Sequence, residues 1–441
     1  MREDGQPGLV PRLRFPEFRN GPLWAGKPMG EVYSFKSNNS LSRDQLNYEH
    51  GSVKSIHYGD IHTKFSTLFD ITKETVPFIN APESLNGFRP ENDCVEGDMI
   101  FADASEDLED IGKGIEVVRL NGERVVSGQH TILARPKDDS LVIGFGAYLF
   151  KSRRVRTQIQ KESQGSKVLG ISATRLTKIA LPIPRTKGEQ KRIAECLSSV
   201  DDLITAQARK LDALKTHKKA LMQHIFPREG ETQPRLRFPE FQNAAEWVEH
   251  KLDNLVHFQD GFAFKSTDFV KSAEEATQVI RITDINNQNT NEDKVYIPNA
   301  FLESNNLTKH SVDNGDLLLS LTGAAGFNFF FWDAGPAVIN QRTAKVAPKK
   351  KSDHALTGLL EPLVHERINA RGEGQNNNLS KEFLSSVVVL IPDPGEQHRI
   401  ADCLTSLDDL ITAQSQTLES LKTHKKGLMQ QLFPSPQELA P

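Results

Sequence analysis

The chain has 441 residues, a formal net charge of −4 and 37% hydrophobic residues, a composition typical of soluble globular proteins rather than disordered or membrane ones. The near-neutral charge argues against indiscriminate polyanion binding, although a local basic face remains compatible with it. The chain shows no long apolar run and no signal-peptide pattern, so we expect a cytoplasmic protein without a membrane partner. Cys94, Cys196 and Cys403 are too widely spaced for a disulfide framework or a CxxC zinc site.

The chain contains two copies of one plan. The octapeptide PRLRFPEF occupies residues 11–18 and again residues 234–241, and Trp24 and Trp247 follow at the same distance. Further matched segments are SIHYGDIH (55–62) with VIRITDIN (279–286), GDMIFA from Gly97 with GDLLLS from Gly315, and GQHTILARP from Gly128 with NQRTAKVAP from Asn340. Internal repetition of this extent indicates a duplicated fold.

Each copy begins with a variable domain and ends with a shared segment. Short apolar runs such as TILARP and SVVVLIP alternate with polar loops, which predicts an α+β protein built from two duplicated α/β domains. We divide the chain into a first variable domain (1–187), a central helix (188–227), a second variable domain (228–394), a distal helix (395–434) and a tail (435–441).

The shared segments predict two long helices. Their apolar residues follow alternating steps of four and three over about five heptads, the pattern of a coiled coil, and each helix would be about 55 Å long. Gln207, Lys218, Gln414 and Lys425 fill the polar gaps; the glutamines are either partly exposed or fix the register. The predicted seam is Ile193, Leu197, Val200, Ile204, Gln207, Leu211, Leu214, Leu221, Ile225, Ile400, Leu404, Leu407, Ile411, Gln414, Leu418, Leu421, Leu428 and Leu432. Either direction of pairing is possible, but halves related by a pseudo-twofold axis would make it antiparallel.

Basic residues gather once in each variable domain. Arg, Gln and Asn side chains can pair with base edges, and Lys and Arg neutralise phosphates, so we take these clusters as candidates for DNA binding. The candidates are Lys151, Arg153, Arg154, Arg156, Lys161, Lys167, Arg342, Arg367, Arg371, Gln375 and Asn376. The alternative for any charge run is a solvated face, which the recurrence in both copies makes less favourable.

The sequence predicts neither an active site nor a metal site. It contains no GxxxxGK[ST] phosphate loop, no HExxH pair and no GxSxG elbow. Asp60 and Asp284 fall in separate copies, and one acid in each domain does not make an acid–base pair.

The ordered features resemble a known family over essentially the whole chain. LRFPEF followed by Trp, and a closing P-x-P or P-D-P, EQ-x-x-I and DDLITAQ, are similar to the specificity subunit of type I restriction-modification systems. The resemblance implies two target recognition domains that each read one part of a split DNA site, and an antiparallel helical spacer. It also implies docking to methyltransferase subunits, two in number, and to motor-nuclease subunits. S-adenosylmethionine, ATP and Mg are then expected on those partners, and this chain is expected to bind no cofactor and to be non-catalytic.

Three other functions are weighed against this one. The chain could be a stand-alone DNA-binding regulator, a nuclease with an unrecognised site, or a structural coiled-coil scaffold. If it is a specificity subunit, the unlike sequences of its variable domains predict an asymmetric DNA target, because two identical readers would require a palindrome.

The octapeptide predicts a hydrophobic clip between each variable domain and a helix end. Its second copy begins soon after Phe226, where the first helix ends, so in equivalent halves the first copy would lie beside the end of the second helix. We therefore expect the two clips to close the chain into a ring. The predicted contacts are those of Phe15 and Phe18 with Phe433, and of Phe238 and Phe241 with Phe226.

Overall fold

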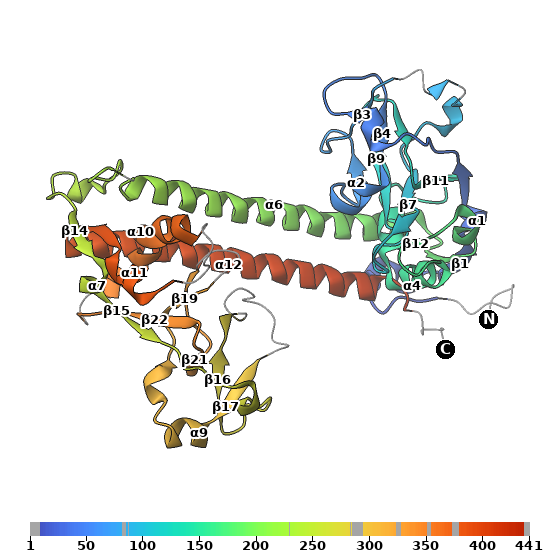
Figure 1. Ribbon diagram of the computed structural model, residues 1–441. Coiled ribbons are helices and arrows are strands. Elements are labelled where there is room, and N and C mark those ends of the chain that lie inside the picture. Colours follow the sequence, from blue (N-terminus) through green and yellow to red (C-terminus); the bar gives the residue numbers. More distant parts are fainter. Residues whose placement is uncertain are drawn as a thin grey trace. The chain divides into compact units, whose positions relative to one another are not determined.

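The protein forms two compact units in a computed structural model (Figure 1). The structure describes residues 9–81, 85–86, 88–228, 230–282, 284, 294–322, 328–350, 354–372 and 379–435. Unit 1 comprises Met1–Ala208 with Gln416–Pro441, and unit 2 comprises Arg209–Ser415. Both boundaries fall within the long helices α6 (Lys187–Ile225) and α12 (Pro394–Leu432), so each unit holds a variable domain, the start of one helix and the end of the other.

Unit 1 is built around two larger sheets. The five-stranded sheet has the order β2 (Tyr33–Lys36), β11 (Thr131–Pro136), β7 (Met99–Ala102), β9 (Gly114–Arg119) and β5 (Leu68–Asp70). The four-stranded sheet has the order β10 (Val125–Ser127), β4 (Lys54–Ile56), β6 (Phe78–Ile79) and β3 (Leu46–Asn47). Two small sheets pair β1 (Ala25–Pro28) with β13 (Ala180–Ile183), and β8 (Ala104–Ser105) with β12 (Leu169–Gly170).

The shorter helices of unit 1 connect these strands. They are α1 (Met29–Val32), α2 (Tyr58–Thr63), α3 (Phe145–Lys151), α4 (Arg153–Glu162) and α5 (Ala173–Leu176). In Figure 1, β3 and β4 lie at the end of the unit away from α4.

Unit 2 repeats the plan with different loops. One sheet has the order β15 (Val256–Asp260), β22 (Thr343–Pro348), β19 (Leu317–Ser320) and β20 (Phe329–Phe331). A second has the order β17 (Val295–Pro298), β16 (Ala276–Ile280), β21 (Ala337–Ile339) and β18 (Ser311–Val312), and a third pairs β14 (Val248–Lys251) with β23 (Val388–Ile391). Its shorter helices are α7 (Leu252–Leu255), α9 (Asn299–Ser304), α10 (His354–Gly372) and α11 (Lys381–Ser386).

The central strand of each unit separates two hydrophobic cores. In β7, Met99 and Phe101 belong to the core that includes the long helices, whereas Ile100 and Ala102 belong to the core beneath α2. Successive side chains of a strand point to opposite faces, so a strand covered on both faces must be apolar throughout. In β19 of unit 2, Leu318 likewise faces a different core from its two neighbours.

The long helices pair antiparallel. In unit 1, Ile193 and Leu197 near the start of α6 share a core with Leu432 at the end of α12. In unit 2, Ile225 at the end of α6 shares a core with Ile400 near the start of α12. Because the start of one helix meets the end of the other in both units, the helices run in opposite directions. None of the described helices is long and apolar enough to cross a membrane.

The heptad pattern marks the buried side of both helices. Every residue of the predicted seam is buried or half-buried, while residues between them such as Glu195 and Asp202 are exposed. Two seam lysines bind aspartates of the opposite helix: Lys218 Nζ lies 2.6 Å from Asp408 Oδ1, and Lys425 makes the equivalent ion pair with Asp201.

The octapeptide joins each variable domain to the end of a long helix. The Leu13 N–H donates to the carbonyl oxygen of Gln431 at 2.9 Å, and Phe15 packs against the core that contains Phe433. The Leu236 N–H makes the equivalent bond to His224, and Phe238 packs against the core that contains Phe226.

The second phenylalanine of each octapeptide occupies a different place. The 3₁₀ turns Pro16–Phe18 (η1) and Pro239–Phe241 (η5) direct it toward the start of a helix. There a side chain at Gly188 or Gly395 would come within 3.5 Å of the ring of Phe18 or Phe241. These two rings therefore contact the helix starts, where the clip hypothesis put them against the helix ends.

A buried polar cluster stands at the start of each long helix. Glu189, in the first turn of α6, is 1% exposed and accepts hydrogen bonds from Arg14 Nε at 2.6 Å and Nη2 at 2.7 Å. The indole N–H of Trp24 donates to the same carboxylate at 3.1 Å. Arg14 also donates to the carbonyl oxygens of Gly21 and Pro22, which fixes the turn after the octapeptide.

Unit 2 contains the same cluster at the start of α12. Arg237 donates to the two carboxylate oxygens of Glu396 at 2.9 and 2.6 Å, and Trp247 donates to Glu396 at 3.2 Å. A carboxylate at this position also meets the positive end of the helix dipole. The octapeptide thus carries the arginine that fastens each variable domain to the start of its own helix, in addition to the hydrophobic clip.

Candidate nucleic-acid interface

The basic candidates of the first copy lie on and after α3 and α4. Lys151, Arg153, Lys161 and Lys167 are exposed. The Lys151 ammonium donates to Thr67 Oγ1. Arg154 is half-buried and donates to the carbonyl oxygen of Ser435 at 2.9 Å, which ties α4 to the segment after α12. Desolvation by burial lowers the pKa of Arg154 from its usual value.

Arg156 has a structural position. Its guanidinium donates to the carbonyl oxygens of Glu109 at 2.9 Å, Ile111 at 2.6 Å and Gly112 at 3.1 Å, and so holds the loop before β9 against α4. Burial lowers the pKa of Arg156, because the charged form loses hydration. A contact of Arg156 with DNA stays a prediction, and it would compete with these bonds.

The basic candidates of the second copy are described only in part. Arg342 is exposed just before β22. Arg367 and Arg371 lie in α10, but their side chains are outside the described part of the structure, as are the whole residues Gln375 and Asn376.

A further cationic surface, which the sequence reading missed, covers α2 in unit 1. The buried Asp60 accepts hydrogen bonds from Arg43 Nη1 at 2.7 Å and Nη2 at 2.9 Å, and Lys64 Nζ lies 3.0 Å away. Burial raises the pKa of Asp60, but the bonds from the two cations outweigh it and hold the pKa below its usual value. The Arg43 and Lys64 side chains remain 44% and 51% exposed, and both donate to the Tyr48 hydroxyl. The carboxylate thus holds two cations and an exposed ring on one surface.

Aromatic rings gather beside this surface. The ring of Tyr58 lies 4.6 Å from that of His57 and 5.3 Å from that of His130. His130 has a left-handed backbone with φ of 56°, and its exposed ring has Nδ1 3.2 Å from Asp103 Oδ1. Burial and the positive charge of Arg43 lower the pKa of His57, which favours its neutral form. We call Arg43, Tyr48, residues 57–64 and residues 128–130 the first corner.

The topology of the sheet explains why these residues meet. β4 and β10 are parallel neighbours, so the segments that follow them, His57 and residues 128–130, leave the same edge of the sheet. The carboxyl edge of parallel strands is where open α/β sheets place ligands. The Asn38 side chain donates to the carbonyl oxygens of Gly128 and Thr131 and supports the second of these segments.

Unit 2 has an equivalent corner with different side chains. β16 and β21 are parallel neighbours, as β4 and β10 are. Arg281 stands at the place of His57 and Arg342 at the place of His130, according to the matched segments. Arg281 Nη2 donates to Asp284 Oδ1 at 3.0 Å, so an aspartate again holds a cation. We call Arg281, Asp284 and residues 340–342 the second corner.

The corners can recognise nucleic acid by two means. Exposed Arg and Lys side chains neutralise phosphates, and an exposed arginine can bond to two acceptors of one guanine edge. Within the described residues, no group of His, Cys, Asp and Glu is arranged to hold a metal ion. The sequence did contain a signal for this site, because matched positions exchange histidine for arginine while the aspartate is retained.

Comparisons with known proteins agree on one family. A model of the type I restriction modification DNA specificity domain matches residues 27–216 and 244–423. The putative type I restriction enzyme MjaX specificity subunit of Methanocaldococcus jannaschii is 26% identical over 349 residues, which are 76% of this chain and 77% of that protein. The MjaVIII specificity subunit of the same organism is 24% identical over 303 residues, 65% of this chain and 69% of that protein.

A solved structure shows the same fold. The crystal structure of the S subunit of a type I restriction-modification system from M. genitalium aligns with a TM-score of 0.60 at 14% identity, over 97% of this chain and 100% of that chain. Each family match begins after an octapeptide and extends from a variable domain into a long helix. The chain therefore belongs to the type I restriction modification DNA specificity family.

Proposed function

We propose that this chain is the DNA-recognition subunit of a type I restriction-modification complex, in which each variable domain reads one half of a split target. The observation that carries the proposal is the pair of corners, which share a topology and an aspartate-held cation but present different side chains. His57 and His130 of the first corner occupy the positions that Arg281 and Arg342 occupy in the second corner. Two domains with the same strand topology but different side chains at this site are suited to recognise two different DNA sequences.

The half-sites are therefore proposed to differ. Arginine donates two hydrogen bonds to the O6 and N7 acceptors of guanine, whereas a neutral histidine offers one donor and one acceptor. Corners with such unlike donor patterns favour different bases. A palindromic target would require like readers, and the corners of this chain are unlike.

The paired helices are proposed to set the gap between the half-sites. The antiparallel pairing within each unit and the unbroken heptad seam support this role, because a helix adds about 1.5 Å for every residue. Lengthening both helices would then lengthen the unread part of the target.

Catalysis is proposed to reside on partner subunits. The family relatives are named specificity subunits of restriction enzymes, which supports assembly of this chain with the other subunits of such an enzyme. We propose that these are two methyltransferase subunits and motor-nuclease subunits, as the resemblance implies. S-adenosylmethionine would then bind to the methyltransferase subunits, and ATP and Mg to the motor-nuclease subunits. The partners themselves carry those sites, so no residue of this chain is assigned to a cofactor.

Purification with the methyltransferase subunit of the same host tests the proposal. We expect a stable complex that methylates adenine in DNA only when both chains are present, and neither chain alone should do so. A chain that purifies alone and binds one continuous DNA site would instead be a stand-alone regulator. Methyl transfer or cleavage by this chain alone would make it an enzyme in its own right.

A further inference from the structure

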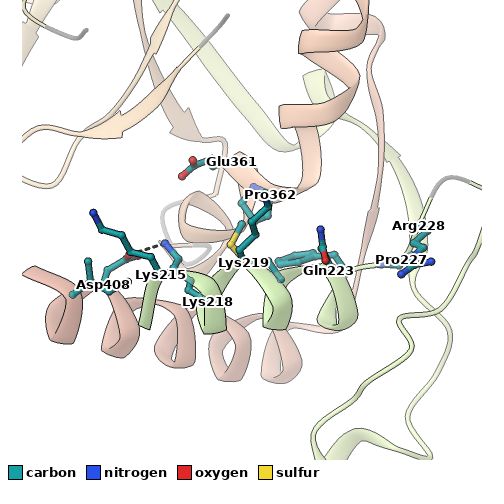
Figure 2. A pocket seen from close by; sticks show the side chains of 12 residues that line it. Lys215, Lys218, Lys219, Gln223, Pro227, Arg228, Glu361, Pro362 and Asp408 are labelled. Carbon is teal, nitrogen blue, oxygen red and sulfur yellow. Dashed lines mark hydrogen bonds and ion pairs between the residues drawn. The ribbon is translucent and has the colours of Figure 1, made fainter. Parts of the chain in front are cut away.

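Unit 2 contains a pocket between α6, α10 and α12. Its volume is about 750 Å³, and its lining combines the apolar Met222, Phe226 and Pro362 with Lys218 and Asp408. Figure 2 shows the hydrogen bond between Lys218 of α6 and Asp408 of α12, and Pro362 of α10 lining the pocket. A volume of this size falls within the range of ordinary ligand sites.

In unit 1 a tyrosine occupies the corresponding place. Tyr148 of α3 is fully buried, and its hydroxyl donates to Asp201 Oδ2 at 2.9 Å. Lys425 binds the other oxygen of Asp201, and its ammonium lies 5.7 Å from the centre of the Tyr148 ring. Asp201 and Lys425 match Asp408 and Lys218 in the repeated helices. The same aspartate and lysine thus surround a phenol in unit 1 and border a pocket in unit 2.

Packing against the helix ends indicates which residue of unit 2 stands where Tyr148 stands in unit 1. Phe145 stacks on Phe433 at the end of α12, and Leu359 shares a core with the matching Phe226 at the end of α6. Tyr148 follows Phe145 by three residues, and Pro362 follows Leu359 by three residues. Pro362 is therefore the counterpart of Tyr148, and it has neither the ring nor the hydroxyl.

The aspartate of unit 2 keeps an acceptor for such a hydroxyl. Asp408 Oδ1 accepts from Lys218 at 2.6 Å, and within the described residues no hydrogen bond reaches Asp408 Oδ2. In unit 1 the equivalent oxygen of Asp201 receives the phenol. The Asp408 side chain is 54% exposed, compared with 32% for Asp201. Unit 2 thus has a solvent-exposed carboxylate oxygen, Asp408 Oδ2, that can accept a hydrogen bond from a hydroxyl.

The rim of the pocket carries more positive than negative charge. Lys215, Lys219 and Arg228 line it together with Glu361, and no ion pair of Lys215 or Lys219 is found among the described residues. Cations without partners beside an apolar pocket complement a segment that carries acidic residues next to an aromatic anchor. A nucleotide would bring its phosphate next to the Asp408 carboxylate, which would repel it.

We propose that this pocket receives a tyrosine side chain from an acidic segment of a partner protein. The phenol hydroxyl donates to Asp408 Oδ2, the ring lies beside the Lys218 ammonium and against Pro362, and the acidic neighbours of the tyrosine face Lys215 and Lys219. The incoming ring thereby completes in unit 2 the arrangement that Tyr148 makes within unit 1. The inference does not depend on DNA recognition.

Binding of two capped amino acids to the full chain tests the proposal. N-acetyltyrosine amide and N-acetylphenylalanine amide differ only by the hydroxyl, and saturation-transfer NMR measures their affinities. We expect the tyrosine probe to bind in the millimolar range and about tenfold more tightly than the phenylalanine probe, since hydrogen bonds to charged groups contribute this much. Equal affinities, or no binding of either probe, would overturn the proposal.

Three variants locate the binding. Pro362→Tyr should fill the pocket from within and abolish the binding of both probes. Asp408→Ala should remove the preference for tyrosine. Asp409→Ala, the same change at the next residue of α12, should leave that preference intact. Circular dichroism establishes that each variant is folded. If Pro362→Tyr is folded and still binds the tyrosine probe as the unaltered chain does, the binding lies elsewhere and the proposal is wrong.

Discussion

Arg14 and Glu189 form a buried ion pair with two hydrogen bonds, although 175 residues separate them in the sequence. Arg237 and Glu396 repeat it in unit 2. This ion pair explains why the octapeptide has the same sequence in both halves of the chain. Its arginine must reach a glutamate at a helix start in both units, and that requirement is the same whatever DNA sequence each domain reads.

Replacing Arg14 by alanine should destabilise unit 1 strongly. The change leaves Glu189 buried without its cation, which costs about 3–5 kcal/mol in comparable cases. Urea unfolding measures the loss. Arg399→Ala is the matched control, because Arg399 and Glu240 form a pair whose side chains are both 47% exposed, and such pairs contribute at most about 1 kcal/mol. Equal losses in the two variants would show that the buried cluster has no special role.

Glu116 should make unit 1 less stable as the pH rises. Its carboxylate accepts the N–H groups of Gly144 at 2.8 Å and Ala147 at 2.6 Å, but burial outweighs them and raises its pKa from 4.5 to about 7. Between these values the folded chain holds a proton that the unfolded chain has lost, so the free energy of unfolding falls as the pH rises through this window.

The size of the effect can be measured with one variant. Glu116→Gln should reduce the drop in unfolding free energy between pH 5 and pH 8 by up to about 3 kcal/mol, since each pKa unit corresponds to about 1.4 kcal/mol. Glu91→Gln, at an exposed site of the same unit, should leave the drop unchanged. An unaltered pH dependence in the Glu116 variant would mean that this carboxyl titrates normally.

Arg342→Ala should change the reading of one half-site only. Loss of a two-bond contact to a guanine should weaken binding to the cognate site by about 1–3 kcal/mol and relax the preference at one position. Binding to a library of sites, measured at one fixed salt concentration, gives both quantities. Arg153→Ala serves as the comparison from the other unit, and a loss of selectivity in both half-sites after Arg342→Ala would contradict the assignment.

Adding seven residues to both long helices should widen the gap in the DNA target. One heptad preserves the seam and adds about 10 Å, which corresponds to about three base pairs of duplex DNA. Mapping of methylated sites in cells that carry the lengthened chain measures the gap. An insertion in α6 alone should instead disturb the register and abolish methylation, and an unchanged gap after the double insertion would exclude the helices as the spacer.

The sequence predicts best where structure depends on local periodicity. Ile193 and Ile400 could be placed in the seam because heptad spacing alone decides which side of a helix is buried. The Arg14–Glu189 pair could not be predicted, since no local pattern connects residues so far apart. The first corner was missed for a similar reason: only the parallel pairing of β4 with β10 brings His57 and His130 together.

Loop insertions concealed the rest. Tyr148 and Pro362 lie in segments of different length, so the repeated motifs alone do not pair them, whereas their packing against the helix ends does. The basic residues of α4 illustrate the opposite limitation. Composition makes Arg156 resemble a phosphate ligand, whereas its three bonds to carbonyl oxygens are visible only in three dimensions.

Mapping the methylated adenines of host DNA, with this chain and without it, tests most directly whether the two domains read two different half-sites. We predict methylation that requires the chain and falls at one split site, with two unlike half-sites separated by a fixed gap. The Arg342→Ala variant should alter one half-site and leave the other unchanged. Methylation that persists without the chain, or a perfectly palindromic site, would contradict the proposed function.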